Sequence, residues 1–174
     1  PAISTVNVSF VSDTDTVLVA METGEADFTY GAAISAVSYQ QAEADGKVGT
    51  DTTTGNSFYF VNFNSQRLSK EIRQALSYAT DREALNTVIT EGTGTIGNFS
   101  IKEGWEGYTD DITTYDYDPE KAKELLAEAG ADGLELTFYY SSSSDNKKLG
   151  ETLQSQWAQV GVTLDLEEVE SGTW

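Results

Sequence analysis

The side chains of this sequence that could perform chemistry are almost all carboxylates. The chain has 29 Asp and Glu residues but no His and no Cys. The commonest general base and transition-metal ligand is therefore missing, as is any thiol nucleophile. No G-x-S-x-G sequence, phosphate loop or dinucleotide-binding fingerprint occurs either. A hydrolase that uses two carboxylates stays open, since such a pair meets in space, but the spacing of these residues singles out no pair.

Two acidic clusters have the side chains to bind a hard cation. Asp13-Thr14-Asp15 resembles the start of a calcium loop, but the Gly and the terminal Glu that such a loop requires are absent. Capping of a following helix explains this cluster better. A solvated acidic loop that ends in a helix cap explains the second cluster, which consists of Asp110, Asp111, Asp116 and Asp118. We therefore predict no metal site, and nothing in the sequence indicates a cofactor.

The charge of the chain excludes several kinds of partner. Its 29 acidic and 10 basic residues give a net charge of −19. Binding to nucleic acid or to anionic lipid needs a basic face, so neither is expected. The charge indicates a well-solvated surface, and an acidic module for protein interaction remains an alternative function. A hydrophobic content of 39% with 11% aromatic residues is enough for a packed core.

Targeting and membrane signals are not found in the sequence. Residues 1–30 contain no basic segment followed by an apolar run, so we expect no signal peptide within them. No stretch is long and apolar enough to span a bilayer. The absence of Cys does not fix the compartment.

Strand-like and helix-like patterns alternate along the chain, which predicts a single α/β domain. The predicted strands are residues 5–11, 26–30, 57–63, 134–140 and 162–169. The predicted helices are residues 13–21, 32–44, 70–79, 82–90, 119–129 and 146–160, the last capped by Ser144 or Asp145. Residues 45–56 and 91–117 are rich in Gly and polar residues and are predicted to be irregular.

The aromatic segment 57–64 changes character along its length. As a strand it would place Phe58, Phe60, Asn62 and Asn64 on one face, so that this face runs from aromatic to polar. Ligands of α/β proteins bind outside the carboxyl ends of strands. The Ser-rich run 141–144 also follows a predicted strand, at the start of a helix whose free N–H groups could meet a carboxylate or carbonyl. An ordinary capped turn explains this run equally well.

Four blocks of sequence carry a resemblance to a known family. Residues 21–28 (M-E-T-G-E-A-D-F) form the first, and a strand ending in Asn64 followed by residues 73–85 (R-Q-A-L-S-Y-A-T-D-R-E-A-L) forms the second. Residues 117–130 (Y-D-P-E-K-A-K-E-L-L-A-E-A-G) and residues 153–169 complete the set. Their order and sequence resemble the second lobe of family 5 extracellular solute-binding proteins of ABC transporters, the peptide and nickel class. The blocks cover nearly the whole chain.

The resemblance implies a fold and a function. It implies an α/β lobe with a mixed sheet flanked by helices, of the periplasmic-binding-protein type (class II), with residues 1–174 as one lobe of a larger two-lobe protein. Such a protein is not an enzyme but a monomeric receptor outside the cytoplasm, in the periplasm or as a lipoprotein on the cell surface. It would capture an oligopeptide, a chelated metal or a similar solute and deliver it to an ABC permease. The resemblance places the ligand-binding side chains at Tyr30, Phe60, Asn62, Ser141 and Asn146.

Overall fold

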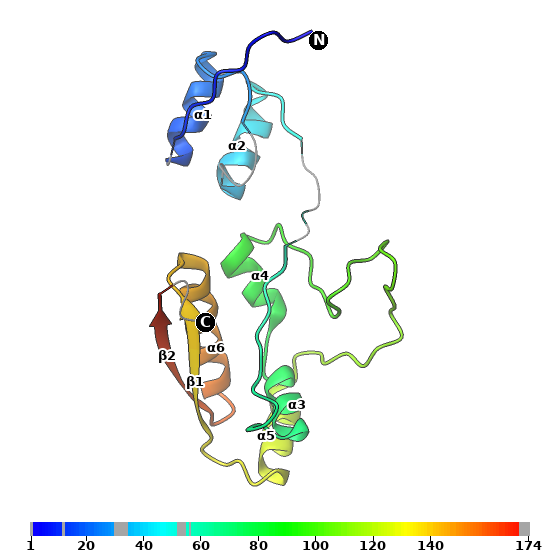
Figure 1. The fold of residues 1–174 in the computed structure, drawn as a ribbon. Coiled ribbons are helices and arrows are strands. Elements are labelled where there is room, and N and C mark those ends of the chain that lie inside the picture. Colours follow the sequence, from blue (N-terminus) through cyan, green and yellow to red (C-terminus); the bar gives the residue numbers. More distant parts are fainter. Residues whose placement is uncertain (1, 12, 30–34, 52–54, 56, 171–174) are drawn as a thin grey trace. The chain divides into compact units, whose positions relative to one another are not determined.

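The chain forms two compact units. The computed structural model describes residues 2–11, 13–29, 35–51, 55 and 57–170 (Figure 1). The units are residues Pro1–Gly55 and Asn56–Trp174. The described residues contain six helices and one two-stranded sheet, so the chain has an α/β composition. None of the described helices has both the length and the apolar character needed to cross a bilayer. That the whole chain is a single lobe remains a prediction.

The first unit contains two short helices, α1 (Thr14–Thr23) and α2 (Ala36–Asp45). The side chain of Asp13 caps α1 by accepting a hydrogen bond from the amide of Thr16 at 2.8 Å, so this Asp serves a helix and not a calcium loop. Gly24 ends α1 in the left-handed conformation, which suits a residue without a side chain. Both helices confirm the prediction, although α2 begins four residues later than expected.

The prediction of strands at residues 5–11 and 26–30 is wrong: the described residues of these two segments are not in β-strands. These residues form no ladder with another strand within the described chain. The alternating side chains that indicated the first strand, Val6, Val8 and Phe10, are exposed, and Phe10 is 98% exposed. Alternation indicates an extended backbone, but a β-strand also requires a partner for its N–H and C=O groups. Tyr30 lies outside the described residues.

The second unit contains the four remaining helices. These are α3 (Lys70–Tyr78), α4 (Arg82–Thr90), α5 (Pro119–Glu128) and α6 (Ser144–Ala158), and they confirm the four predicted helices. The start of α6 differs from the prediction, because its cap is Ser143 and not Ser144 or Asp145. The Ser143 side chain accepts a hydrogen bond from the Asn146 amide at 3.1 Å. The helix therefore begins two residues before the predicted position.

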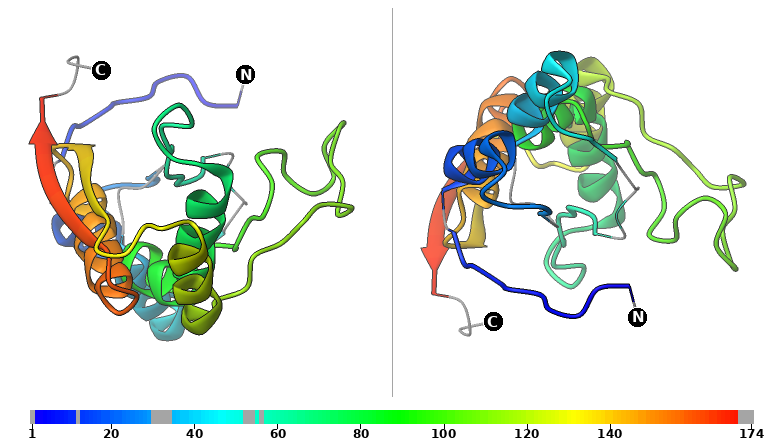
Figure 2. Two further views of the ribbon diagram at one scale, coloured as in Figure 1. Left: turned by 90° about the horizontal axis from the view of Figure 1, so that it is seen from below. Right: turned by 90° about the horizontal axis from the view of Figure 1, so that it is seen from above.

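The sheet of the second unit consists of β1 (Glu135–Ser141) and β2 (Thr163–Val169), which confirm two predicted strands. They are parallel, with Glu135 opposite Thr163 and Ser141 opposite Val169. Helix α6 connects them and lies against the sheet (Figures 1 and 2). The described sheet is thus parallel and two-stranded, and the mixed sheet that was expected is not formed by the described residues.

The predicted strand 57–63 is also wrong, although its side chains alternate as expected. The described residues of this segment are extended but pair with no other described strand. Val61 and Phe63 pack against the hydrophobic core, whereas Phe60 is 61% exposed. The two faces of the segment are therefore distinct, as its sequence indicated, and only the backbone partner is lacking within the described chain.

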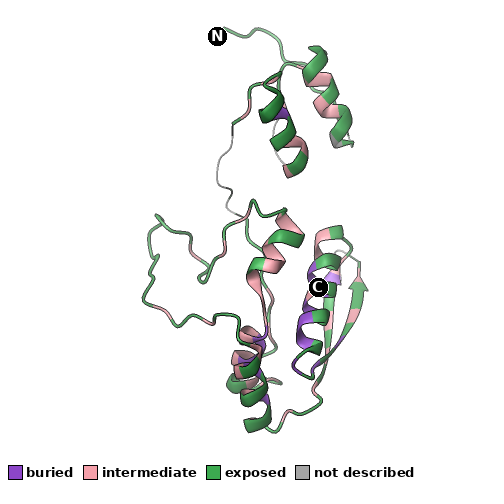
Figure 3. Cartoon of the chain, turned by 180° about the vertical axis from the view of Figure 1, so that it is seen from behind, coloured by how far each residue is buried: buried purple, intermediate pink, exposed green. Residues whose placement is uncertain are grey.

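The hydrophobic core of the second unit lies between the helices and one face of the sheet. Figure 3 shows the buried positions gathered on the inner sides of these elements. The core residues are Ala75, Leu76, Ala79, Ala122, Leu126, Leu149, Leu153, Trp157, Val160, Val162 and Leu164. Two side chains of α6 form hydrogen bonds with the turn between α3 and α4. The side chain of Gln156 hydrogen-bonds both the amide and the carbonyl of Asp81, and the indole of Trp157 donates to Thr80 Oγ1 at 3.1 Å.

The irregular segment 91–117 is confirmed, and it stands out from the helices of the second unit (Figures 1 and 2). Its later part is held by Tyr115. The guanidinium of Arg82 donates to the Tyr115 carbonyl at 2.6 Å, and Gln74 donates to the Tyr115 hydroxyl at 3.0 Å. The ring of Tyr115 also meets the ring of Tyr78 edge-on, with centroids 5.2 Å apart. The segment is therefore anchored where it enters α5.

Candidate ligand-binding site

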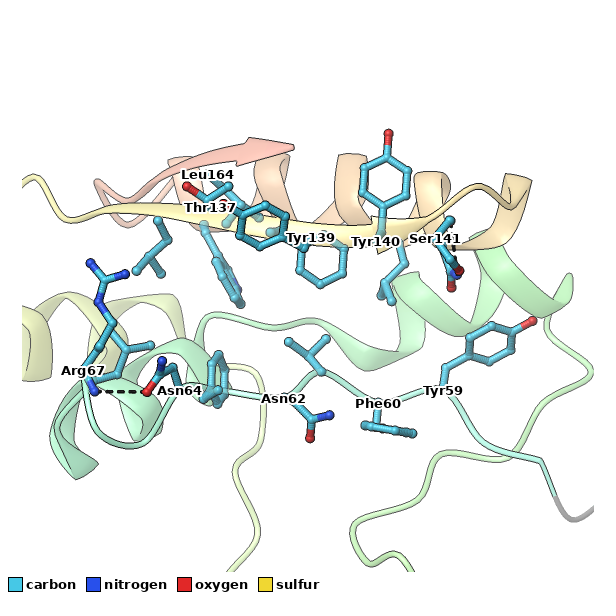
Figure 4. A pocket seen from close by; sticks show the side chains of 18 of the residues that line it. Tyr59, Phe60, Asn62, Asn64, Arg67, Thr137, Tyr139, Tyr140, Ser141 and Leu164 are labelled. Carbon is cyan, nitrogen blue, oxygen red and sulfur yellow. Dashed lines mark hydrogen bonds between the residues drawn. The ribbon is translucent and has the colours of Figure 1, made fainter. Parts of the chain in front are cut away.

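A groove of about 770 Å³ lies in the second unit between the extended segment 58–64 and strand β1 (Figure 4). The size falls in the range of small-molecule sites, about 300–1,000 Å³. Along the groove the residues from Tyr59 to Asn64 run in the opposite direction to those from Thr137 to Ser141 (Figure 4). The groove has an apolar middle and a polar end.

The middle of the groove is bordered by hydrophobic side chains. Val61 and Phe63 line it from the extended segment, and Leu136 lines it from β1. Leu149 and Trp157 of α6 form part of its lining, and both belong to the core. The rings of Phe63 and Trp157 are stacked with centroids 6.2 Å apart. This part of the groove offers apolar contact area.

The polar end of the groove is built where the carboxyl end of β1 meets the start of α6. The side-chain amide of Asn146 donates to Ser141 Oγ at 2.8 Å, which closes the turn between strand and helix. The hydroxyl of Tyr59 donates to Asp145 Oδ2 at 2.8 Å and so joins the extended segment to the same turn. The hydrogen bond to the Asp145 carboxylate raises the pKa of Tyr59 above its ordinary value, with smaller contributions from burial and from the charge of Asp145.

Four of the five side chains predicted for the site line this groove: Phe60, Asn62, Ser141 and Asn146. They divide into two pairs. Phe60 and Asn62 point away from β1 and are exposed (Figure 4). Ser141 and Asn146 are half-buried and bond to each other, so Asn146 has a structural partner that the sequence did not reveal. The fifth residue, Tyr30, lies outside the described residues.

Sequence reasoning missed the contact between Tyr59 and Asp145. No role of its own was predicted for Tyr59, and the sequence indicated Asp145 only as a candidate helix cap. The two residues are 86 positions apart, and no local pattern links them. An Asp in the first turn of a helix is a common and uninformative feature. Among the described residues, no group of three or more acidic side chains is placed to hold a metal ion.

The fold and the groove together indicate the class of protein to which this chain belongs. A concave, largely apolar site with a few convergent polar groups, at the carboxyl end of a parallel strand, is typical of non-covalent ligand binding. The chain belongs to the bacterial extracellular solute-binding proteins, family 5, because the model of the middle region of that family matches residues 1–174. Membership of a binding-protein family agrees with the expectation that the chain is not an enzyme.

Individual relatives have varied ligands. The chain is 30% identical to heme-binding protein A of Haemophilus influenzae over 164 residues, which are 89% of this chain and 30% of that protein. It is 32% identical to the dipeptide-binding protein of Escherichia coli over 124 residues, 66% of this chain and 23% of that protein. The chain thus spans about a third or less of the length of these relatives.

Solved structures agree on the fold. The structure of NikA from Brucella suis in complex with Fe(III)-EDTA matches 94% of this chain and 36% of that protein, with a TM-score of 0.71 and 22% identity. The structure of the PBP AgaA in complex with agropinic acid, from A. tumefacien R10, matches 57% of this chain and 21% of that protein, with a TM-score of 0.53 and 34% identity. The α/β arrangement of this chain is therefore that of known binding proteins.

Proposed function

We propose that this chain is one lobe of the substrate-binding component of an ABC importer. The complete protein captures a solute between two lobes, without covalent chemistry, and delivers it to a membrane permease. It works as a monomer outside the cytoplasm, in the periplasm or anchored as a lipoprotein at the cell surface. The observation that carries this proposal is the match of the family's middle region to all of residues 1–174.

The ligand-binding surface of this lobe comprises the polar end of the groove and the outer face of the extended segment. Phe60 provides an apolar wall and Asn62 offers hydrogen bonds, because both side chains are exposed and turned away from β1. Polar atoms beside the start of α6 come from the hydroxyl of Ser141, the side-chain carbonyl of Asn146 and the hydroxyl of Tyr59. Tyr30 is assigned to the same surface on the resemblance alone.

The ligand is a small solute rather than a macromolecule. Named relatives bind dipeptides or heme, and a related structure holds a nickel–histidine complex, Ni(L-His). A peptide or a metal chelate presents carboxylate and carbonyl oxygens, which suit hydrogen-bond donors such as the Asn62 amide. Hydrolysis by a carboxylate pair, the alternative left open by composition, has no support from a family of binding proteins.

Calorimetric titration of the full-length protein tests this function. The probes are dipeptides and tripeptides, glutathione, heme and Ni(L-His), each added separately to ligand-free protein. We expect one class to bind with a micromolar or lower Kd. Asn62→Ala should weaken that binding by roughly 1–3 kcal/mol if a hydrogen bond is lost inside a closed cleft. Asn7→Ala, which changes an exposed Asn outside the groove, is the matched control. The proposal fails if no probe binds, or if the two variants behave alike.

A further inference from the structure

Two tight turns follow one another at residues 102–108, which we call the tandem turn. The amide of Trp105 donates to the carbonyl of Lys102, and the amide of Tyr108 donates to the carbonyl of Trp105, both at 3.1 Å. Each turn ends in the sequence Glu-Gly-aromatic, and its Gly has a positive φ angle, which suits a residue without a side chain. The tandem turn therefore has a hydrogen-bonded backbone that sets the positions of both aromatic residues.

The tandem turn belongs to a segment that is held near both of its ends. At one end the side-chain amide of Asn86 donates to the carbonyl of Gly94 at 3.0 Å. At the other end the guanidinium of Arg82 donates to the carbonyl of Tyr115 at 2.6 Å. Between these two attachments the chain stands out from the helices of the second unit (Figures 1 and 2). The tandem turn is thus presented on an attached projection, where a partner can reach it.

Both aromatic side chains of the tandem turn are open to water. Trp105 is 53% exposed and Tyr108 is 41% exposed. Within the part of the chain that the structure describes, neither ring contacts another aromatic ring, and neither residue lines the candidate ligand-binding groove. Trp and Tyr are enriched among the residues that contribute most to protein interfaces. Two such side chains on one projecting turn therefore indicate a contact surface that is separate from the groove.

Carboxylates accompany the two rings along the sequence. The acidic residues of the tandem turn and of the residues just after it are exposed: Glu103, Glu106, Asp110 and Asp111. Among the described residues, none of these four forms an ion pair. The faces of Trp and Tyr rings carry partial negative charge as well. An apolar partner would bury the carboxylates without replacing their hydration, and an anionic partner would be repelled, so the surface is complementary to cations.

We infer that residues 102–111 form a docking surface for a segment of a partner protein that is rich in Arg or Lys. Cationic side chains of the partner stack on the rings of Trp105 and Tyr108, while the carboxylates of the same surface accept their hydrogen bonds. Arg suits this surface better than Lys, because its planar guanidinium both stacks on a ring and donates several hydrogen bonds. The inference goes beyond the proposed function and depends neither on the solute nor on the groove.

Calorimetric titration of the full-length protein at low salt tests the inference, because exposed charges are least screened there. The probe is a peptide of alternating Arg and Ser, acetylated at one end and amidated at the other. We expect this peptide to bind. The double variant Trp105→Ala with Tyr108→Ala should weaken binding about 10-fold, because each exposed ring contributes several-fold to the affinity for a cation. The double variant Trp105→Phe with Tyr108→Phe keeps both rings and should retain most of the affinity.

The control variant separates this surface from the charge of the whole chain. Phe10→Ala removes a side chain that is 98% exposed and lies outside residues 102–111, so it should leave binding of the peptide unchanged. Equal binding by wild type and the double Ala variant overturns the inference, since it would mean attraction to the net charge of −19 alone.

Two further outcomes also overturn the inference. One is failure of the Arg-Ser peptide to bind. The other is binding of the docking surface to phosphatidylcholine vesicles but not to the peptide, which would identify a membrane as its partner. Failure of every solute to bind would overturn the proposed function but would leave this result unchanged, because residues 102–111 do not line the groove.

Discussion

The hydroxyl of Tyr59 donates a 2.8 Å hydrogen bond to the carboxylate of Asp145, across 86 residues of sequence. This contact joins the extended segment 58–64 to the first turn of α6, beside the turn that Ser141 and Asn146 close. Tyr59 is 52% exposed, so the bond is accessible to water. The contact therefore positions the candidate site more than it stabilises the fold.

Replacing Tyr59 by Phe should lower the free energy of unfolding by at most about 1 kcal/mol, the usual value of an exposed hydrogen bond. Tyr139→Phe is the matched control, because Tyr139 is equally exposed and has no hydrogen-bond partner for its hydroxyl among the described residues. Urea denaturation at neutral pH measures both variants. Equal stabilities for the two variants would show that the contact contributes nothing.

The same hydrogen bond has a predictable pH dependence. The pKa of Tyr59 is raised in the folded protein, mainly by its bond to Asp145. The stability it contributes is thus complete below the unfolded pKa of about 10 and is lost as the pH rises through the higher folded pKa. The stability difference between wild type and Tyr59→Phe should be constant from about pH 7 to 9 and shrink above about pH 10. A difference that grows with pH would contradict this assignment.

Gln156 should be more important for stability than its polarity suggests. It is 7% exposed, and its amide group satisfies both the N–H and the C=O of Asp81. Gln156→Leu would leave both backbone groups without this partner, at a cost of about 1–3 kcal/mol. Gln159→Leu, at an exposed position beyond the end of the same helix, should change stability by less than about 0.5 kcal/mol. Thermal unfolding followed by circular dichroism distinguishes the two.

Gly150 of α6 faces the sheet at close range. A Cβ atom at this position would lie 3.1 Å from Leu166 Cδ2 and 3.2 Å from Phe138 Cδ1. Gly150→Val should therefore destabilise the second unit by about 1–3 kcal/mol through overpacking, despite the gain in backbone rigidity. Ser155→Val places the same side chain at an exposed position of α6 and should have little effect. An unchanged melting temperature for Gly150→Val would show that the sheet can move aside.

Asn146 bonds to Ser141, and the proposed function also places it on the ligand-binding surface, so its replacement tests both roles. Asn146→Ala removes the hydrogen bond to Ser141 and should reduce stability by about 0.5–1.5 kcal/mol. If the turn also holds ligand, binding by the full-length protein should weaken by roughly 1–3 kcal/mol. Ser141→Ala breaks the same bond from the other side and is the comparison. A loss of stability without a loss of affinity in both variants would make this turn purely structural.

The helices and the β1–α6–β2 unit could be predicted from the sequence because their signals are local. Asp118 followed by Pro119 marks the start of α5, and Asp81 marks the start of α4. Each of these caps acts within its own first turn, so neighbouring residues are sufficient to recognise it. The start of α6 was misplaced because several consecutive residues, Ser143 among them, are all able to cap a helix.

The sequence by itself determined the family, the class of fold and the alternation of segment 58–64, because these depend on local order and periodicity. Only the tertiary structure decided whether an extended segment becomes a strand, since pairing depends on a backbone elsewhere in the chain. It likewise decided that Tyr59 meets Asp145 and that Asn146 bonds to Ser141. Such contacts depend on how distant elements pack, and the residue types that form them occur at many other positions in so acidic a chain.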